Sequence, residues 1–519
     1  MPKLKPLKNP GSVSAVLLSD TSTAIVNYIR AGYPGLYVVS SEEQRVEGEF
    51  KAIADHLDYQ LHFWSVVDGL VDVRNNAVKS ANDPLEALEA VGLLPEKSLI
   101  LLKDFHLFLA DPNPILLRKL KDTLLVAKMK QKVIIVLGCR LCLPPELEHE
   151  FTIVEFQLPG KSELRAVLGG IMDSANIRSL EVEIREKAVE AASGLTTMEA
   201  ENAFALSVAE TKAITPSIIA REKAQAVKKN GLLEIVDSKA SLNSIGGLDG
   251  LKDWLVRRKD AFSQRAQAYG LPALKGLLIV GIPGTGKSLS AKATASVFNV
   301  PLIKLDAGKL YGGLVGQSEG NLRAVIQTVE AIAPCCLWID ELEKGFAGSK
   351  SSGSTDGGTS ARVFGSFLSW MQEKTKPVFV VATANDVSQL PAEMLRKGRF
   401  DELFFVDLPN QQERESIWGI VVAKYKRDPN DHDLQQLSRI TEGLTGAEIE
   451  AVYLEAMFAA FERGKEPTDL DVASALNCFV PLSRLMADSI SALKLWAKGR
   501  ARPATLASSS ESCGRKLVV

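Results

Sequence analysis

The chain has 519 residues, of which 46% are hydrophobic and 24% charged, a composition typical of a folded protein and not of a disordered one. Its 61 Lys and Arg residues nearly balance 63 Asp and Glu residues, and the net charge of −2 argues against a generally basic nucleic-acid-binding protein. No apolar run reaches the ~18–20 residues that cross a bilayer, and the first residues lack the apolar stretch of a secretory signal. We therefore expect a soluble, intracellular protein with about three or four folding units.

The first half of the chain contains three short apolar segments of the kind that form buried strands. They are residues 35–40, 99–104 and 133–138. The first runs directly into Ser-Ser-Glu-Glu-Gln-Arg (40–45), which holds no glycine-rich loop. A Cys-x-x-Cys pair, Cys139 and Cys142, has no second pair at the spacing of a zinc site, so we expect buried structural thiols there. We expect the same of Cys335 and Cys336, which open a predicted core strand in the second half.

Residues 276–297 combine a predicted strand, a glycine-rich loop and a predicted helix. The loop reads Gly-Ile-Pro-Gly-Thr-Gly-Lys-Ser at 281–288. Glycines let backbone N–H groups surround a phosphate, and the helix N-terminus adds its dipole. In this context Lys287 is predicted to reach the β- and γ-phosphates of ATP, and the Ser288 hydroxyl to bind Mg²⁺. The other residues assigned to ATP are Gly281, Pro283, Gly284, Thr285, Gly286 and Leu289.

Polar residues follow the next two predicted strands. Asp340 and Glu341 follow the predicted strand at 335–339, and Asn385 follows the predicted strand at 377–384. After such a strand the first acid is predicted to hold the Mg²⁺ shell, and the second to activate the attacking water as a general base. The Asn385 amide is placed to hold that water or the γ-phosphate.

Two arginines, Arg396 and Arg399, flank a glycine further along the chain. A solvated turn would account for them. Their position after the Asn385 strand favours another role, which is to neutralise transition-state charge on the γ-phosphate of a neighbouring subunit. Activity would then require a ring, for which we expect a hexamer.

Taken together, residues 241–480 resemble an AAA ATPase module of the narrow AAA clade. The motifs above stand at its Walker A, Walker B, sensor and arginine-finger positions, in the same order. The resemblance implies an ATP hydrolase that uses Mg²⁺. It further implies that a loop wraps the adenine and that a helical lid approaches the base and ribose. The residues implied for these two contacts are Ile245, Gly246, Gly247, Gly446 and Ala447.

The end of the chain is similar to an AAA family encoded in plastid genomes and cyanobacteria. The similarity lies in Pro-Leu-Ser-Arg at 481–484 and Trp-Ala-Lys-Gly-Arg-Ala-Arg-Pro at 496–503. It implies a photosynthetic setting, in the cytoplasm or, for a plastid-encoded chain, in the stroma. AAA unfoldases grip a threaded polypeptide with an aromatic residue in a pore loop, where this chain has Leu314. Threading is therefore disfavoured, although Tyr311 lies three residues earlier.

The first half repeats the organisation of the second half without its chemistry. Glu42 and Glu43 stand where the phosphate loop would be, and Asp104 is followed by Phe105 instead of a glutamate. Carboxylates repel a triphosphate, and no lysine offsets them. We therefore predict an α/β fold in which a P-loop AAA module, a parallel sheet plus a helical lid, is preceded by a degenerate AAA-like domain that neither hydrolyses nor tightly binds ATP.

The predicted boundaries follow from these motifs. The expected domains are the degenerate domain at 1–235 (large part to about 158, lid to about 230), the AAA large subdomain at 236–409, its helical lid at 410–480, a C-terminal helix at 481–503 and a disordered tail at 504–519.

The leading interpretation is an AAA ATPase that hydrolyses ATP in a ring to remodel or regulate a protein partner. A first alternative is a nucleotide-gated scaffold or regulator with slow hydrolysis, which the degenerate half and the missing pore aromatic favour. A second is a nucleic-acid motor, which the near-zero net charge disfavours. A basic cluster near the C-terminus is interpreted as a solvated face. Its members are Lys494, Lys498, Arg500 and Arg502.

Overall fold

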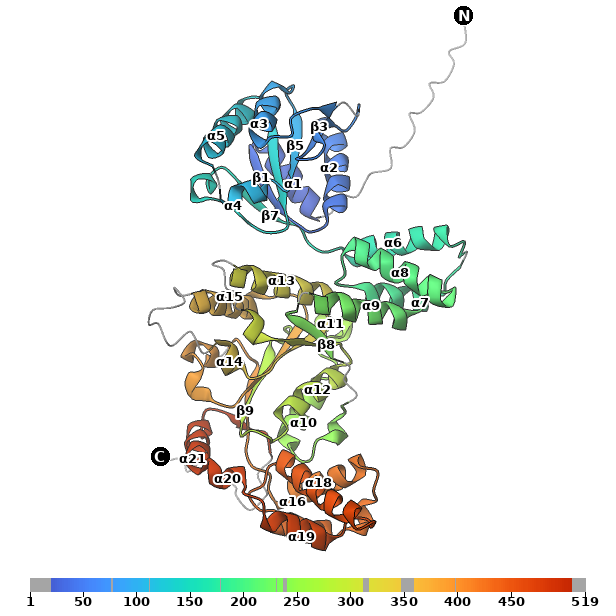
Figure 1. Cartoon of the computed structure of the whole chain (residues 1–519), viewed down its shortest axis with the longest axis vertical. Helices are drawn as coiled ribbons and strands as arrows, with labels where there is room; N and C mark the ends of the chain where they lie inside the picture. Colours follow the sequence, from blue (N-terminus) through green and yellow to red (C-terminus); the bar gives the residue numbers. More distant parts are fainter. Residues whose placement is uncertain are drawn as a thin grey trace, which may run out of the picture. The chain divides into compact units, whose positions relative to one another are not determined.

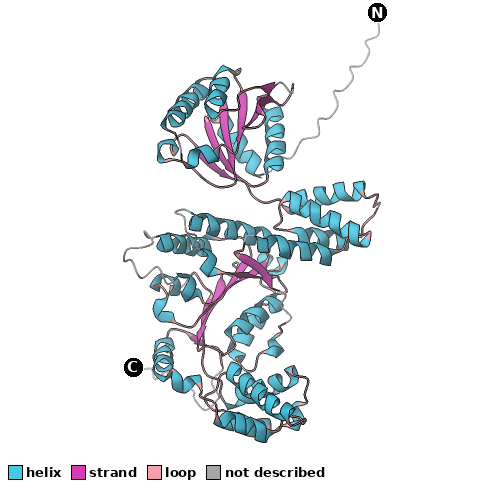
Figure 2. Ribbon diagram, in the orientation of Figure 1, coloured by secondary structure: helices cyan, strands magenta, loops and turns pink. Residues whose placement is uncertain are grey.

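The computed structural model describes residues 20–75, 78–111, 113–177, 179–229, 231–236, 240–310, 317–346, 359–396 and 398–505. The chain divides into two compact units, residues 1–159 with 196–201, and residues 160–195 with 202–519. Each unit is built on a seven-stranded sheet with helices against it (Figures 1 and 2). In the described part of the chain, no helix has the length and apolar character needed to span a membrane.

The sheet of the first unit has the strand order β4-β3-β2-β5-β6-β1-β7. Strands β2, β5, β6, β1 and β7 are parallel, and β3 and β4 extend the β2 edge as an antiparallel hairpin. Every residue of β6 is buried, as expected for a parallel strand covered on both faces. The strands are β1 (Gly35–Val39), β2 (Gln60–Ser65), β3 (Gly69–Asp72), β4 (Val78–Lys79), β5 (Ser98–Lys103), β6 (Val133–Gly138) and β7 (Thr152–Glu155).

Helices cover both faces of this sheet. Helices α1 and α2 pack on one face and α3, α4 and α5 on the other, each side with its own apolar cluster. Asp83 and Asn113 cap α3 and α5 by accepting backbone N–H groups, and a proline follows each cap. The helices are α1 (Asp20–Arg30), α2 (Glu43–Leu57), α3 (Pro84–Leu93), α4 (His106–Ala110) and α5 (Pro114–Met129).

The sheet of the second unit has the order β14-β13-β9-β12-β11-β10-β8. Its five central strands are parallel. Taken in chain order, they occupy the same relative positions as β1, β2, β5, β6 and β7 of the first unit. The strands are β8 (Leu233–Val236), β9 (Gly276–Gly281), β10 (Leu302–Leu305), β11 (Cys335–Ile339), β12 (Val378–Ala384), β13 (Glu402–Val406) and β14 (Arg502–Pro503).

The second unit contains helices that flank its sheet and, after β13, a group of helices that includes the lid. The helices around the sheet are α10 (Asp249–Val256), α11 (Gln264–Tyr269), α12 (Lys287–Phe298), α13 (Gln317–Ile332), α14 (Leu342–Phe346) and α15 (Thr359–Glu373). The lid consists of α16 (Gln411–Lys424), α17 (Leu434–Ile440), α18 (Gly446–Glu462) and α19 (Asp469–Asn477), followed by α20 (Leu482–Leu485) and α21 (Ala487–Ala497).

The helices after the first sheet belong mostly to the second unit, and the last of them packs against its sheet. They are α6 (Lys161–Ser174), α7 (Val182–Ala192), α8 (Thr197–Thr211) and α9 (Pro216–Lys229), of which all but the start of α8 belong to the second unit. Val227 of α9 shares an apolar cluster with Leu278 of β9, and Gly194 closely approaches Ile332. Strand β8 follows α9 and pairs antiparallel with β10. The predicted division at 235/236 therefore differs from the structure, because residues 233–235 already belong to the second sheet.

The C-terminal segment also differs from the prediction. The expected disordered tail was to begin at 504, but Ala504 is fully buried. Its N–H donates to the carbonyl of Phe405 and its carbonyl accepts the N–H of Leu251, so its backbone is paired on both sides. The predicted helix at 481–503 is two helices followed by β14.

The cysteine prediction was half right. Cys335 and Cys336 are buried in β11, as expected, whereas Cys139 is exposed and Cys142 is half-buried. The reason is position. Cys335 and Cys336 lie within the central strand β11, whereas Cys139 and Cys142 follow the end of β6, where the chain leaves the sheet.

A carboxylate at position 504 tests whether the C-terminal strand is part of the core. Ala504→Glu buries an unpaired charge, and we expect the free energy of unfolding of the second unit to fall by about 3 kcal/mol. Urea unfolding followed by tryptophan fluorescence measures the change. Ala459→Glu, at an exposed position of α18, is the matched control and should change stability by less than about 0.5 kcal/mol. Equal midpoints for both variants would contradict the burial of Ala504.

Candidate functional site

The glycine-rich loop joins β9 to α12 and has the conformation that its sequence predicts. Gly284 and Gly286 have φ angles of 80° and 91°, in the left-handed region that favours glycine. A Cβ atom on Gly284 would lie 2.9 Å from Oγ1 of Thr445 in the lid. Glycine is therefore required at this position both for the turn and for close contact with the lid.

Lys287 is the first residue of α12, and its side chain folds back into the loop. Its Nζ donates to the carbonyl oxygens of Gly281 at 2.8 Å and Ile282 at 2.7 Å. Burial lowers the pKa of Lys287 to about 8, although Glu343, Asp340 and Glu341 act in the opposite direction. A bound phosphate would supply the negative charge that this buried ammonium lacks.

The carboxylate of Asp340 joins the ends of neighbouring strands. Its Oδ1 accepts the hydroxyl of Ser288 at 3.2 Å and that of Thr383 at 2.7 Å. The Thr383 hydroxyl in turn accepts the backbone N–H of Glu341 at 3.1 Å. The predicted Mg²⁺ ligands, Ser288 and Asp340, are thus brought together, and their hard oxygen donors suit that ion.

Sequence reasoning did not identify Thr383. It lies in β12 between apolar residues and is buried. The available signal was a hydroxyl-bearing residue two positions before Asn385, at the end of a strand that faces a phosphate loop.

Glu341 is held by two side chains. Its Oε1 accepts Nδ2 of Asn385 at 3.1 Å, and its Oε2 forms an ion pair with Lys344 at 2.7 Å. Its φ angle of 47° is uncommon for a residue other than glycine. The backbone N–H of Asn385 donates to Glu343 at 2.9 Å, which fixes the start of the segment after β12. Lys344 and Glu343 are further residues that the motif reading missed.

A cavity of about 970 Å³ lies between the glycine-rich loop, the loop at 240–246 and the lid. Fourteen of the predicted residues line it: Ile245, Gly246, Pro283, Gly284, Thr285, Gly286, Lys287, Ser288, Leu289, Asp340, Glu341, Asn385, Gly446 and Ala447. Lining residues that sequence reasoning missed include Asn243, Ser244, Thr383, Ile417, Ile420, Val421, Lys424 and Glu450. Gly247 and Gly281 are not among the lining residues. Gly247 lies against Glu413, and the carbonyl oxygen of Gly281 accepts a hydrogen bond from the Lys287 ammonium.

The lid contacts the glycine-rich loop directly. The N–H of Ala447, in the first turn of α18, donates to the carbonyl of Gly284 at 3.1 Å. Thr445 caps α18 by accepting the N–H of Glu448. The lid therefore reaches the P-loop through the start of α18.

Glu413 of α16 ties the loop before α10 to the lid. This buried carboxylate accepts the N–H of Leu248 at 3.0 Å and that of Asn410 at 3.0 Å. It also accepts the hydroxyl of Thr505 at 2.7 Å, next to the C-terminal strand. Besides closing the local capping box with Asn410, this side chain thus binds two segments that are distant in sequence, and no motif pointed to it.

The two predicted arginines lie outside the cavity. Arg396 is exposed, and Arg399 is half-buried. The Nη1 atom of Arg399 is buried and has no hydrogen-bond partner within the described ranges. Neither residue lines the cavity of its own chain.

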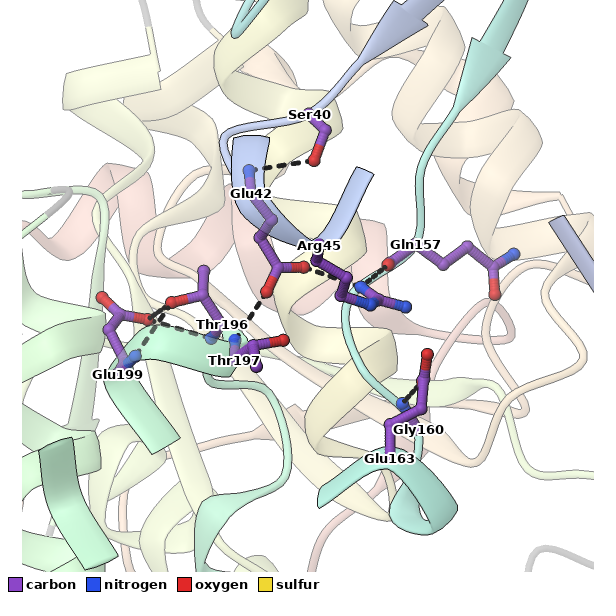
Figure 3. Close-up of polar contacts among 9 residues, drawn as sticks. All are labelled: Ser40, Glu42, Arg45, Gln157, Gly160, Glu163, Thr196, Thr197 and Glu199. Carbon is purple, nitrogen blue, oxygen red and sulfur yellow. Dashed lines mark hydrogen bonds and ion pairs between the residues drawn. The ribbon is translucent and has the colours of Figure 1, made fainter. Parts of the chain in front are cut away.

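The corresponding position of the first unit holds an ion pair of the protein itself (Figure 3). Only three residues separate β1 from α2, so no phosphate loop forms. The Glu42 carboxylate accepts Nη1 of Arg45 at 2.7 Å and the N–H of Thr197 at 2.5 Å. Arg45 also donates to the carbonyl of Gln157 at 2.7 Å. The Glu42 carboxylate thus satisfies a backbone N–H at the start of α8.

Four segments of the chain match known protein families. Residues 277–408 match the ATPase family associated with various cellular activities (AAA), and residues 431–472 match the AAA+ lid domain. Residues 21–156 and 162–230 match the N-terminal and second domains of SpoVK-like AAA ATPases.

Nearly the whole chain is similar to proteins described as uncharacterized AAA domain-containing protein ycf46. It is 40% identical to that of Trieres chinensis over 491 residues, which cover 93% of this chain and 97% of the relative. The proteins of Pyropia yezoensis and Guillardia theta are each 40% identical, over 92% and 90% of this chain and 98% and 93% of their own lengths. The chain therefore belongs to the AAA ATPase family and, within it, to the group of AAA domain-containing proteins that ycf46 represents.

Proposed function

We propose that the second unit hydrolyses ATP with Mg²⁺ in a ring oligomer, a hexamer by expectation, and that the resulting conformational change remodels or regulates a protein partner. Membership of the AAA family supports ATP hydrolysis as the general activity. The observation that carries the specific proposal is that Ser288, Asp340, Glu341 and Asn385 meet at one cavity beside Lys287.

Each residue has a chemical part in this proposal. Lys287 and the loop N–H groups bind the phosphates, and Ser288 and Asp340 hold the ion. Bound Mg²⁺ neutralises charge on the phosphate oxygens. Glu341 accepts a proton from the attacking water, and Asn385 orients that water or the γ-phosphate. Ile245 and Gly246, together with Gly446 and Ala447, contact the adenosine.

The ring follows from the place of the arginines. A charge that stabilises the transition state must lie close to the γ-phosphate, but Arg396 and Arg399 do not line the cavity of their own chain. We infer that a neighbouring subunit presents them. The exposure of Arg396 supports this inference, because a neighbouring subunit can receive only a side chain that reaches the surface.

A protein is the proposed partner because the chain carries almost no net charge to attract nucleic acid. The photosynthetic setting, cytoplasmic or stromal, rests on the similarity to the ycf46 proteins. The loop containing Tyr311 and Leu314, on which threading depends, lies outside the described residues.

One contact favours the second candidate, a nucleotide-gated regulator with slow hydrolysis. Lys344 pairs with the carboxylate of Glu341, so this carboxylate has to leave the ion pair before it can face an attacking water. Lys344 is largely exposed, so solvent screens this pair and its effect is modest. Slow turnover of the unmodified chain in the assays below, with no increase on adding partner, would favour the regulator.

Removing the proposed base should stop turnover without removing ATP. Glu341→Gln keeps the shape of the side chain but cannot accept the proton, so we expect kcat to fall by about 10²- to 10⁴-fold with ATP affinity retained. Phosphate release and binding of a fluorescent ATP analogue measure the two effects. Unchanged turnover would refute the assignment of Glu341, and lost binding would indicate misfolding.

The proposed role of Arg396 is tested by mixing subunits. Arg396→Ala should lower kcat by about 10³-fold or more while ATP affinity stays unchanged. Mixing it with the Glu341→Gln variant should restore part of the activity, since some interfaces then combine an intact base with an intact arginine. Arg439→Ala, at an exposed position of α17, is the control. Failure of the mixture to recover any turnover would contradict action between subunits.

We expect one nucleotide per chain. Equilibrium dialysis of the Glu341→Gln variant with ATP should give a stoichiometry of one, and adding Lys287→Ala should abolish binding because the phosphates lose their ammonium. Glu42→Gln should not create a second site, since no glycine-rich loop or lysine follows β1. Two nucleotides per chain, or binding that survives Lys287→Ala, would overturn the degenerate status of the first unit.

A further inference from the structure

A second large cavity, of about 870 Å³, lies in the second unit beside α10, α11 and β14. It shares no lining residue with the nucleotide cavity. We propose that this cavity, which we term the arginine pocket, binds an acidic peptide segment of a protein partner, with an apolar side chain of that segment packed against the pocket's exposed tyrosine and leucine.

The charge of the pocket is unbalanced. Four arginines line it, against two acids. The arginines are Arg257, Arg258, Arg265 and Arg502, and the acids are Asp253 and Asp260. Arg502 forms an ion pair with Glu402 at 3.4 Å. No carboxylate in the described part of the chain forms an ion pair with Arg257 or Arg265, and both are exposed. Their guanidinium groups are therefore available to carboxylates of a ligand.

Part of the pocket is fixed in place before any ligand binds. The guanidinium of Arg258 lies 3.9 Å above the ring of the buried Trp254 and donates to its carbonyl oxygen at 3.2 Å. Arg502 is held by β14, which pairs with β13. Groups that are already ordered lose little conformational entropy on binding, which favours affinity.

The rim of the pocket adds apolar surface. Tyr269 is 83% exposed and Leu271 is 54% exposed. A tyrosine beside several arginines is the composition of a protein-binding site, where both residue types are enriched. Guanidinium groups pair with carboxylates in a two-pronged geometry, so the complementary ligand carries acids next to an apolar residue.

A polynucleotide fits this pocket less well. Asp253 and Asp260 would face its phosphates, and the net charge of −2 provides no long-range attraction. The basic cluster expected from the sequence is also dispersed, because Lys494 pairs with Asp407 at 2.8 Å and Arg500 donates to the carbonyl of Trp496. Only Arg502 of that cluster reaches the pocket.

Fluorescence anisotropy tests the proposal with the full chain and no added nucleotide. The probe is a labelled peptide of Glu and Asp around a central Phe-Leu pair, and its controls are the same peptide with Gln and Asn, and an oligouridylate of equal length. We expect the acidic peptide to bind and both controls not to bind, and we expect the affinity for the acidic peptide to fall as the salt concentration rises. Arg257→Glu and Arg265→Glu should each weaken it by about tenfold or more.

Two further variants sharpen the result. Tyr269→Ala should weaken binding of the Phe-Leu peptide but not of an all-acidic one, which separates the apolar contact from the charge. Arg185→Glu, an equal charge change at an exposed position of α7, should leave binding unchanged. Unaltered affinity in Arg257→Glu and Arg265→Glu, or tighter binding of the oligouridylate, would overturn the proposal. Since no nucleotide is present, that failure would leave the ATPase proposal intact.

Discussion

The hydrogen bonds from Ser288 and Thr383 to the carboxylate of Asp340 are the interactions on which the geometry of the candidate site depends. They join the start of α12 to the ends of β11 and β12. This is possible only because the strand order places β12 between β9 and β11, with all three parallel, so that their carboxyl ends share one edge. The proposed ion ligands, the proposed base and the glycine-rich loop then meet without any long loop to position them.

The first unit shows what the same strand order does without those side chains. Its core is as well buried, with β5 and β6 almost free of solvent contact, but the end of β1 leads into Glu42 and Arg45 instead of a phosphate loop. A carboxylate held by a guanidinium and by a backbone N–H needs no ligand to satisfy it. The first unit thus combines the strand order of the second with an internal ion pair at the position of the phosphate loop, which supports our proposal that it does not bind nucleotide.

Most of the features that were predicted correctly from the sequence depend on residues close together in the chain. The P-loop, the strands that precede Asp340 and Asn385, and α12 are determined by residues adjacent in the chain, and they were predicted. Thr383 was missed because threonine is an ordinary strand residue, and only its hydrogen bond to Asp340 of the neighbouring strand brings it into the candidate site. Glu413 was missed because it binds Leu248 across more than a hundred residues of sequence. Strands β8 and β14 were missed because segments of four and two residues gain their structure only by pairing with β10 and β13.

The pairing of β14 has a consequence for the exposed edge of the second sheet. Residues 502–505 emerge from the ribosome after every other strand of their sheet, yet they cover the edge of β13, fill the space at Ala504 and reach Glu413. A chain cut before Arg502 would leave the Phe404–Phe405 backbone as an open sheet edge, the kind of surface that pairs with other chains and aggregates. Residues 502–505 therefore serve the fold in two ways, because they complete the core at Ala504 and also protect the edge of β13 from pairing with another chain.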